Sequence, residues 1–258
     1  MTDTMLKIDI QGDIAVLTMD RPAKRNAMCD QLLEEIDAFF SKPPAEVKVA
    51  VLTGTAGHYC SGLDLSEHVA RDAEGTMRHS RGWHAVMDKI QYGGLPVVSA
   101  MMGAVIGGGL ELATSTHVRI AEPSTIFQLP EGRRGIYVGG GASVRVGRIL
   151  GADRMVEMML TGRKYNAEEG AALGLAHYAV GEGEALPKAM ELAGKIARNA
   201  PLSNYVMIHA LSRIEDMDKA GGLFTESLCA ALTQTSPDAV EGLAAFLEKR
   251  APSFGQGR

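Results

Sequence analysis

Glu111 is the first residue whose type and position could do chemistry, because it directly follows a run of glycines at 107–109. The apolar segment 96–102 precedes this run and Leu110-Glu111-Leu112-Ala113 follows it, which predicts a strand, a tight turn and the start of a helix. The first amides of a helix lack intrahelical partners and carry partial positive charge, and glycines let a ligand approach them closely. The segment therefore predicts an oxyanion-binding turn with an acid or base beside it.

The same segment also has a purely structural interpretation. Glycine-rich turns between a strand and a helix often serve close packing, and a glutamate in the first turn stabilises the helix dipole. Two further segments bear on the choice between these interpretations. Residues 58–65 follow the apolar run 47–53 and offer a second turn with free amides, and residues 129–141 contain a second glutamate, Glu131, before another glycine run.

Apolar and amphipathic segments alternate along most of the chain, which predicts an α/β protein with largely parallel sheets. After residue 185 the pattern is helical only, and Ser236-Pro237-Asp238 is a strong start signal for the last helix. We expect strands at 14–19, 47–53, 96–102, 117–121 and 175–180, and helices at 30–40, 76–90, 153–160, 166–174, 186–198, 202–214 and 222–232.

Composition excludes several functional classes. The chain has 258 residues, 46% of them hydrophobic, and a formal net charge of −5, which is typical of a globular protein and argues against nucleic acid as its partner. No apolar run is long enough to span a bilayer and no signal peptide is evident, so we expect a cytoplasmic protein that does not insert into a membrane. Cys29, Cys60 and Cys229 show no metal-ligand spacing and are expected to be reduced core residues.

Three separated motifs, in this order and spacing, resemble the crotonase (enoyl-CoA hydratase/isomerase) superfamily. The resemblance extends from about residue 14 to 254, because one more motif stands near each end. The family's S/A-G-x-D-L, GGG-x-E-L-A and P-E motifs are matched by Ser61–Leu65, Gly107–Ala113 and Pro130-Glu131, its R-P-x-x-x-N-A turn by Asp20–Met28, and its F-x-E-K-R signature by Phe246–Arg250.

The resemblance implies the fold and the assembly. It implies an α/β protein built as a crotonase-like spiral of repeated ββα units, with a C-terminal all-helical oligomerisation region. Residues 1–198 would form the spiral core with the active site, and residues 199–258 the helical region at subunit contacts. Family members form homo-oligomers, either trimers or hexamers, in which the position of Phe254 can reach a neighbouring coenzyme.

The resemblance also implies an active site. In the family two backbone amides grip the thioester carbonyl oxygen of an acyl-coenzyme A, and here they correspond to the N–H groups of Ser61 and Gly108. Family members that hydrate enoyl-CoA place two glutamates around one water molecule. These correspond to Glu111 and Glu131, and Gly139 matches the position whose amide helps to hold that water.

The same carry-over gives the substrate-binding residues. Lys24 and Arg25 align with the turn that contacts the phosphorylated end of the coenzyme, and the alternative for both is a solvated basic turn. Ser61 and its neighbours Gly62, Leu63 and Asp64 would line the substrate, although Asp64 alone is typical of a residue that caps its own turn. Coenzyme A is part of the substrate, so no separate cofactor and no metal is expected.

Retention of both glutamates favours hydration of a 2-enoyl-CoA to a 3-hydroxyacyl-CoA through a stabilised enolate, with the acid and base roles left open. Enoyl-CoA isomerase, hydratase-lyase and hydrolase activities are alternatives on the same fold. A non-catalytic acyl-CoA-binding protein is a third possibility. A dinucleotide-dependent oxidoreductase is disfavoured, because Leu112 and Val144 stand where its fingerprint needs the third glycine.

Some neighbouring side chains leave the acyl specificity open. Val138 stands where many hydratases carry proline, and Tyr137 before it is expected to be buried against the core, with contact between its phenol and the substrate as the alternative. Arg133 and Arg134 are expected on the surface, although they could approach an acidic acyl tail. Core positions are expected for Met155, Met158 and Met159.

Overall fold

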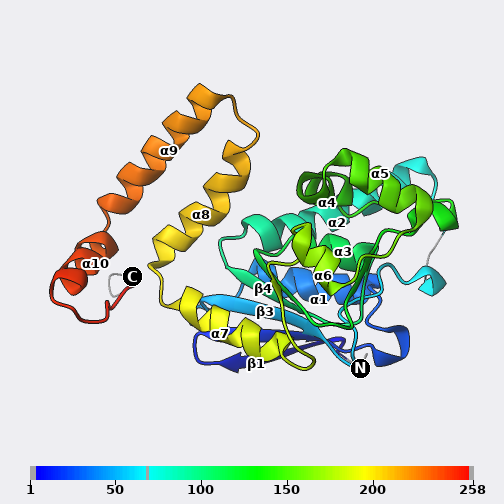
Figure 1. Cartoon of the computed structure of the whole chain (residues 1–258), viewed down its shortest axis with the longest axis horizontal. Helices are drawn as coiled ribbons and strands as arrows, with labels where there is room; N and C mark the ends of the chain where they lie inside the picture. The colour runs from blue at the N-terminus through cyan, green and yellow to red at the C-terminus, as the bar shows by residue number, and fades with distance from the viewer. Residues whose placement is uncertain (1–3, 68–69, 256–258) are drawn as a thin grey trace.

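A six-stranded sheet forms the centre of the structure, a computed structural model that describes residues 4–67 and 70–255 (Figure 1). Its strand order is β1-β2-β3-β4-β6-β8, with an antiparallel first pair and parallel pairs after it. A second sheet pairs β5 with β7 in parallel. The strands are β1 (Leu6–Gln11), β2 (Ile14–Met19), β3 (Val49–Gly54), β4 (Val97–Met101), β5 (Ala104–Ile106), β6 (Val118–Ala121), β7 (Ile126–Gln128) and β8 (Tyr178–Ala179).

The two faces of the main sheet are covered by different helices, as the alternation of side chains along β2 shows. Ala15 and Leu17 belong to a core shared with α1 (Asp30–Ser41) and α2 (Ala73–Tyr92), whereas Ile14 and Val16 pack in a second cluster with α7 (Ala185–Ala197). Because β2 is apolar at almost every position, both faces exclude water, as expected for a parallel sheet inside an α/β protein.

The two long helices on the first face form for identifiable reasons. Helix α1 buries an apolar stripe that includes Leu32, Ile36 and Phe39, at spacings of three and four residues. Helix α2 begins after Asp72, whose side chain accepts a hydrogen bond from the N–H of Gly75. Its buried face carries Trp83, which also forms part of the candidate site.

The expected strands and helices are confirmed, with boundaries that differ by a few residues. The sequence analysis missed β1, β5, β7 and α4. The remaining elements are η1 (Pro22–Lys24), η2 (Leu65–Glu67), α3 (Gly108–Thr114), η3 (Glu131–Arg134), α4 (Ala142–Leu150), α5 (Ala152–Thr161), α6 (Ala167–Ala172), α8 (Pro201–Ile214), α9 (Lys219–Gln234) and α10 (Pro237–Leu247).

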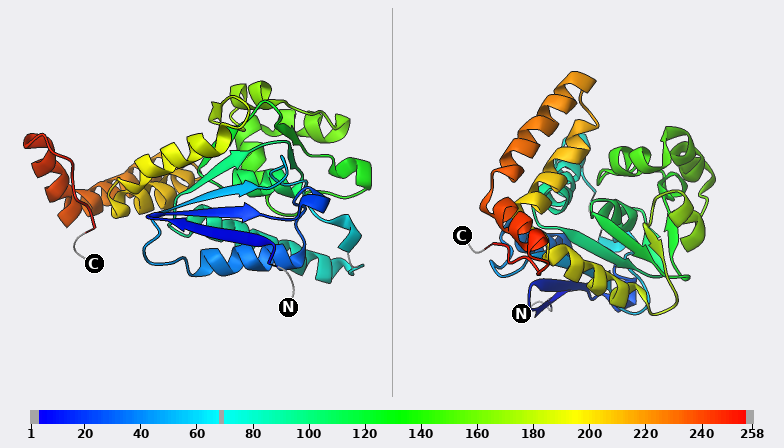
Figure 2. Two further views of the ribbon diagram at one scale, coloured as in Figure 1. Left: turned by 90° about the horizontal axis from the view of Figure 1, so that it is seen from below. Right: turned by 60° about the vertical axis from the view of Figure 1, so that its left-hand side comes forward.

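The C-terminal helices α8, α9 and α10 extend away from the sheet, as Figure 1 and the left view of Figure 2 show. Their apolar side chains are largely exposed: Phe224 is 66% exposed and Phe246 79%. Cys229 on α9 is only partly buried, so the expectation of a core position is wrong for it, whereas Cys29 and Cys60 are buried. Within the described residues no helix has both the length and the apolar character needed to cross a bilayer.

Candidate active site

The glycine turn between β5 and α3 leaves a backbone amide open. Gly107 adopts φ 54°, a left-handed conformation that favours glycine, and α3 starts at Gly108. In residues 4–67 and 70–255 no acceptor receives a hydrogen bond from the N–H of Gly108. A Cβ at Gly108 would lie 2.9 Å from the ring of Trp83, so a side chain there would collide with the wall of the site. The sequence-based prediction of a strand, a tight turn and a helix start is confirmed, and this helix start is buried.

The second turn, residues 60–65, lies directly against the first. A bridge between Cys60 and Val105 joins it to β5. A Cβ added at Gly62, which has φ 96°, would meet the carbonyl oxygen of Ile106 at 2.7 Å and the N of Gly108 at 3.2 Å. Only glycine permits this close contact, which brings the backbones of the two turns together.

The amide of Ser61 is not available to a ligand, which corrects the expectation for this residue. Its N–H donates to the carbonyl oxygen of Arg25 at 3.0 Å, and its hydroxyl donates to the carbonyl oxygen of Lys24. The N–H of Leu63 is open instead. Gly62 and Asp64 on either side bond to Met28, so the backbone of Leu63 between them faces away from Met28, and no acceptor in the described chain receives its N–H.

Glu111 is buried in the first turn of α3 and is held by a glycine loop. Its Oε1 accepts hydrogen bonds from the N–H of Gly140 at 2.8 Å and of Ala142 at 3.1 Å. Burial raises the pKa of Glu111, while these two amides and the nearby Arg145 guanidinium oppose that rise. Two amide donors favour the ionised form, so the side chain is fixed in position as an acceptor.

Glu131 opens η3 and is buried in a different way. Its Oε2 has no hydrogen-bond partner within the described chain. Burial raises its pKa to about 7, its own backbone amide opposes the rise, and the charge of Glu111 adds to it. A carboxyl group with a pKa near neutrality can act as a proton donor or acceptor at physiological pH.

Both glutamates line the same cavity, of about 190 Å³. The expected site residues Ser61, Gly62, Leu63, Gly108 and Gly139 also line it. Trp83 closes one side with the benzo edge of its indole, since carbon atoms of that edge lie nearest to the Cβ positions of Gly108 and Gly140. The remaining lining residues are Leu65, Thr76, His79, Ser80, Ile106, Gly107, Pro130, Arg134, Ile136, Tyr137, Val138 and Gly140.

Asp64 stabilises its turn and does not line this cavity. Its carboxylate pairs with the guanidinium of Arg21 at 3.0 Å and accepts from the N–H and hydroxyl of Ser66. Burial alone would raise the pKa of Asp64, but the hydrogen bonds from Ser66 and Arg21 outweigh it and the pKa is lowered. The capping interpretation is therefore confirmed, and contact between Asp64 and the substrate stays a prediction.

Lys24 and Arg25 lie on the outer side of the same turn. The Nζ of Lys24 donates to the hydroxyl of Ser66 at 2.7 Å and lies 3.7 Å from Asp64. Arg25 has an exposed side chain and a left-handed backbone with φ 49°. Neither residue lines the cavity of the glutamates. A ligand that contacted both the glutamates and these two basic side chains would therefore extend over the turn of residues 60–65.

The sequence analysis missed the side chains that hold the glycine loop. The hydroxyl of Ser80 on α2 donates to the carbonyl oxygen of Gly139 at 2.6 Å. The buried guanidinium of Arg145 donates to the carbonyl oxygen of Gly140 at 3.2 Å and to Asp88 at 2.6 Å. An arginine in the first helical turn after a glycine run was the available signal, but its partner Asp88 is 57 positions away.

We predict that Gly140→Ala lowers kcat at least about 10-fold, because displacing a catalytic group by about 1 Å can cost as much as 10²-fold. The added Cβ would lie 2.6 Å from Oε2 of Glu111 and 3.1 Å from Trp83, so the carboxylate must shift. Gly139→Ala is the matched control, because its Cβ would meet only Ser80, at an ordinary 3.7 Å. Steady-state kinetics of both variants check the prediction, and an equal loss in both would contradict it.

One expectation for the residues after Glu131 is wrong. Tyr137 is 69% exposed and lines the cavity instead of packing in the core. Met155 and Met158 are buried in the core as expected and Met159 packs against it, while Met155 and Met159 also line a second cavity beside Tyr137. Arg134 also lines the glutamate cavity, which adds a cation to its rim.

Comparison with known proteins identifies the family. Residues 9–257 match the family model described as enoyl-CoA hydratase/isomerase. The chain belongs to this enoyl-CoA hydratase/isomerase family. An enoyl-CoA hydratase from Mycobacterium tuberculosis is 30% identical over 96% of this chain and 95% of its own length, and a 2,3-dehydroadipyl-CoA hydratase from Escherichia coli is 31% identical over 96% and 98%. The crystal structure of an enoyl-CoA hydratase from Bacillus anthracis matches with 30% identity, a TM-score of 0.91 and coverage of 97% and 98%.

Membership of the enoyl-CoA hydratase/isomerase family confirms three expectations. The crotonase-type α/β fold with C-terminal helices is shared with solved structures of the family. The chain is an enzyme of the hydratase type, and acyl-CoA thioesters are the substrate class of the family. The individual acyl group and the role of each residue follow from neither the family nor the fold.

Proposed function

We propose that this protein adds water to the double bond of a 2-enoyl-CoA thioester and releases a 3-hydroxyacyl-CoA. The observation that carries the proposal is one cavity lined by two buried glutamates and by two turns with open amides, at Leu63 and Gly108. Relatives named as hydratases, including a 2,3-dehydroadipyl-CoA hydratase, support hydration over other reactions of the family. No metal or further cofactor enters the proposal.

The open amides account for activation of the thioester. We place the thioester carbonyl oxygen between the N–H groups of Leu63 and Gly108, which donate to the negative charge that develops as an enolate forms. The N–H of Gly108 also stands at the positive end of α3. Loss of one such donor typically costs about 10²–10³ in rate, so this pair supplies a large part of the catalysis.

We infer the roles of the two glutamates from their different surroundings. Glu111, which already accepts two amide hydrogen bonds, takes a proton from water as the water oxygen bonds to the β-carbon. Electrons of the double bond move onto the thioester oxygen. Glu131, with an unpaired buried oxygen and a pKa of about 7, then gives its proton to the α-carbon. Proton exchange with water restores both groups, and the reaction needs no other reactant.

The pH dependence of kcat/KM follows from these roles. Activity requires protonated Glu131, so it declines as pH rises above its pKa of about 7. It also requires ionised Glu111, so it declines at acid pH, and the two apparent pKa values belong to the coupled pair. A kcat/KM profile from pH 5 to 9 is expected to be bell-shaped. Activity that climbs through pH 7 to an alkaline plateau would reverse the assignment.

Lys24 and Arg25 are proposed to contact the phosphates of coenzyme A. We predict that Arg25→Ala raises KM about 5-fold and leaves kcat near wild type, because an exposed charge-assisted contact is worth about 1 kcal/mol. The loss should shrink at high ionic strength, since salt screens exposed charges. Lys42→Ala, which removes an exposed cation on the far end of α1, is the control. Unchanged KM for Arg25→Ala would contradict the contact.

The C-terminal region is proposed to mediate assembly into a trimer or hexamer. The described part of this region, residues 199–255, contains three helices whose exposed apolar side chains need a partner surface, and Phe254 remains a candidate for contact with a neighbouring coenzyme. A cytoplasmic location also remains a prediction. Light scattering of the purified protein distinguishes the assemblies, and a monomer would contradict the proposal.

Loss of the conjugated-thioester absorbance tests the proposed function. Crotonyl-CoA and longer or aromatic 2-enoyl-CoAs are expected to lose this absorbance and to yield 3-hydroxyacyl-CoA by mass spectrometry. Isomerisation of a 3-enoyl-CoA without any hydration would indicate an enoyl-CoA isomerase instead of a hydratase. Release of free coenzyme A or of an aldehyde would indicate a hydrolase or a hydratase-lyase, and binding without turnover would indicate an acyl-CoA-binding protein.

A further inference from the structure

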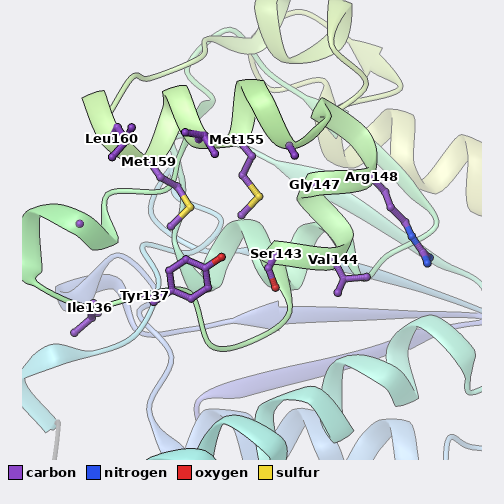
Figure 3. A pocket seen from close by; sticks show the side chains of 12 residues that line it. Ile136, Tyr137, Ser143, Val144, Gly147, Arg148, Met155, Met159 and Leu160 are labelled. Carbon is purple, nitrogen blue, oxygen red and sulfur yellow. The ribbon is translucent and has the colours of Figure 1, made fainter.

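A second cavity, of about 610 Å³, lies between η3, α4 and α5 (Figure 3). Pockets for small molecules typically measure about 300–1,000 Å³, so this cavity could hold a sizeable part of a ligand. The reaction mechanism above uses none of its walls. It is lined by Gly132, Ile136, Tyr137, Ser143, Val144, Gly147, Arg148, Ala152, Met155, Val156, Met159 and Leu160.

The second cavity adjoins the cavity of the glutamates. Ile136 and Tyr137 line both. In Figure 3 the ring of Tyr137 projects beneath Met155 and Met159 of α5, with Ser143 of α4 beyond its hydroxyl group. Residues 136 and 137 therefore form the wall that the two cavities share, and a group bound beside the glutamates lies next to this wall.

The lining of the second cavity is apolar although much of it faces solvent. The exposed fractions are 69% for Tyr137, 54% for Val144, 53% for Val156 and 82% for Leu160. Four large apolar side chains exposed around one cavity form a patch of the kind that marks a binding site. Arg148 is the one charged residue of the lining, and its guanidinium is paired with Asp216.

The flexible Met155 and Met159 thioethers suit a ligand without fixed shape. Only Tyr137, Ser143 and Arg148 offer hydrogen bonds among the lining side chains, and Arg148 is already paired, so a carboxylate or sugar would find few partners, whereas methylene groups gain from leaving water. The acyl chain of the bound thioester is the group that can reach this apolar lining from the active site, so it is the expected occupant of the second cavity.

We propose that the second cavity binds the distal part of a long acyl chain, with Tyr137 at the passage between the cavities. The proposal rests on acyl-CoA binding at the glutamate site and extends it by naming the substrate class, a medium- or long-chain aliphatic acyl group. The walls on α4 and α5 thereby select chain length, while the glutamates act on the bond next to the thioester.

Saturated acyl-CoAs test this proposal, because they bind without being hydrated. Calorimetry on the wild-type protein is expected to show dodecanoyl-CoA binding much more tightly than butyryl-CoA, since each buried methylene strengthens binding about 4-fold. Val156→Trp fills the cavity from an exposed position of α5 and should lower this affinity ratio at least about 10-fold. Ser143→Trp fills it from α4 and should act alike.

Arg154→Trp is the matched control, because Arg154 is exposed on the same helix and does not line the cavity. An unchanged ratio in Val156→Trp and Ser143→Trp, or equal binding of both acyl-CoAs by the wild type, would overturn the proposal. If size-exclusion chromatography showed that Val156→Trp alters assembly and leaves the ratio unchanged, the patch would be an interface between copies and the proposal would also fall.

The hydration assay with crotonyl-CoA separates this proposal from the proposed function. Hydration by the wild type together with an unchanged binding ratio in the filled variants would refute the distal subsite alone. Absence of hydration together with a lowered ratio would refute the hydratase function and support the subsite.

Discussion

Replacement of Glu131 by Gln is expected to lower kcat on a 2-enoyl-CoA by about 10²–10⁴, the usual contribution of a positioned proton donor. An amide cannot give a proton to the α-carbon, yet it preserves the shape of the buried side chain. KM for the coenzyme thioester should stay near wild type, because the open amides and the outer turn are untouched. Steady-state kinetics with crotonyl-CoA check this result.

The stability of the Glu131→Gln variant separates a catalytic carboxyl from a structural one. Burial raises the pKa of Glu131 to about 7, so between its usual value and 7 the folded protein holds a proton that the unfolded chain has lost. Stability of the wild type therefore falls as pH rises through this window, by about 3 kcal/mol at most.

The Glu131→Gln variant does not lose stability in this way as pH rises. Its melting temperature should therefore match the wild type at pH 4 and equal or exceed it at pH 8. Glu168→Gln, on the exposed side of α6, should change neither activity nor stability. A variant of Glu131 that melted well below the wild type at pH 8 would show that the carboxylate serves the fold.

Replacement of Glu111 by Gln is the second large effect that we expect, again a loss of about 10²–10⁴ in kcat. The Gln side chain can still accept the amides of Gly140 and Ala142 through its carbonyl oxygen, so the glycine loop keeps its position. It can no longer take a proton from water. Kinetics and thermal melting on the same preparation should show lost turnover with nearly unchanged stability.

Glu122→Gln is a matched control for Glu111. Glu122 is also buried, and its Oε1 accepts the N–H of Ala185 at 3.1 Å, but it lies outside the cavity. Its replacement is expected to leave kcat and the melting temperature near wild type, because the carbonyl oxygen of Gln can accept the same amide. If Glu111→Gln resembled Glu122→Gln, with turnover kept, the role of Glu111 as a base would be refuted.

The sequence predicted the elements that position the site because their signals are local. A glycine run between an apolar segment and Leu110-Glu111 is enough to predict the turn and the start of α3. The capping box of Asn166 and Glu169, which opens α6, was visible for the same reason. Three-residue strands such as β5 and β7 were missed, because they are too short to show a period of two.

The choice between the amides of Ser61 and Leu63 could not be made from the motif. Ser61 and Leu63 are two positions apart, so an extended segment would point both N–H groups to the same side, and only the contacts with Arg25 and Met28 show which one is used internally. These partners come from a turn more than thirty positions earlier. The spacing of the motif carries no information about them.

Burial of Tyr137 was predicted from the sequence, and this prediction was wrong for a related reason. Aromatic side chains bury large areas against apolar neighbours, but here η3, α4 and α5 leave a cavity beside the ring. Packing of this kind depends on how two helices are separated in space, which residue types alone do not determine. Met155 belongs to the core as its spacing predicts, but the spacing gave no sign that Met155 and Met159 also line this cavity.

A crystal structure of the protein with a bound 3-hydroxyacyl-CoA tests the central claim most directly. We predict that the thioester oxygen lies about 2.7–3.1 Å from the N atoms of both Leu63 and Gly108, with the 3-hydroxyl group between the carboxyl groups of Glu111 and Glu131. A thioester oxygen bound away from these two amides, or a 3-hydroxyl group that contacts neither glutamate, would contradict the account.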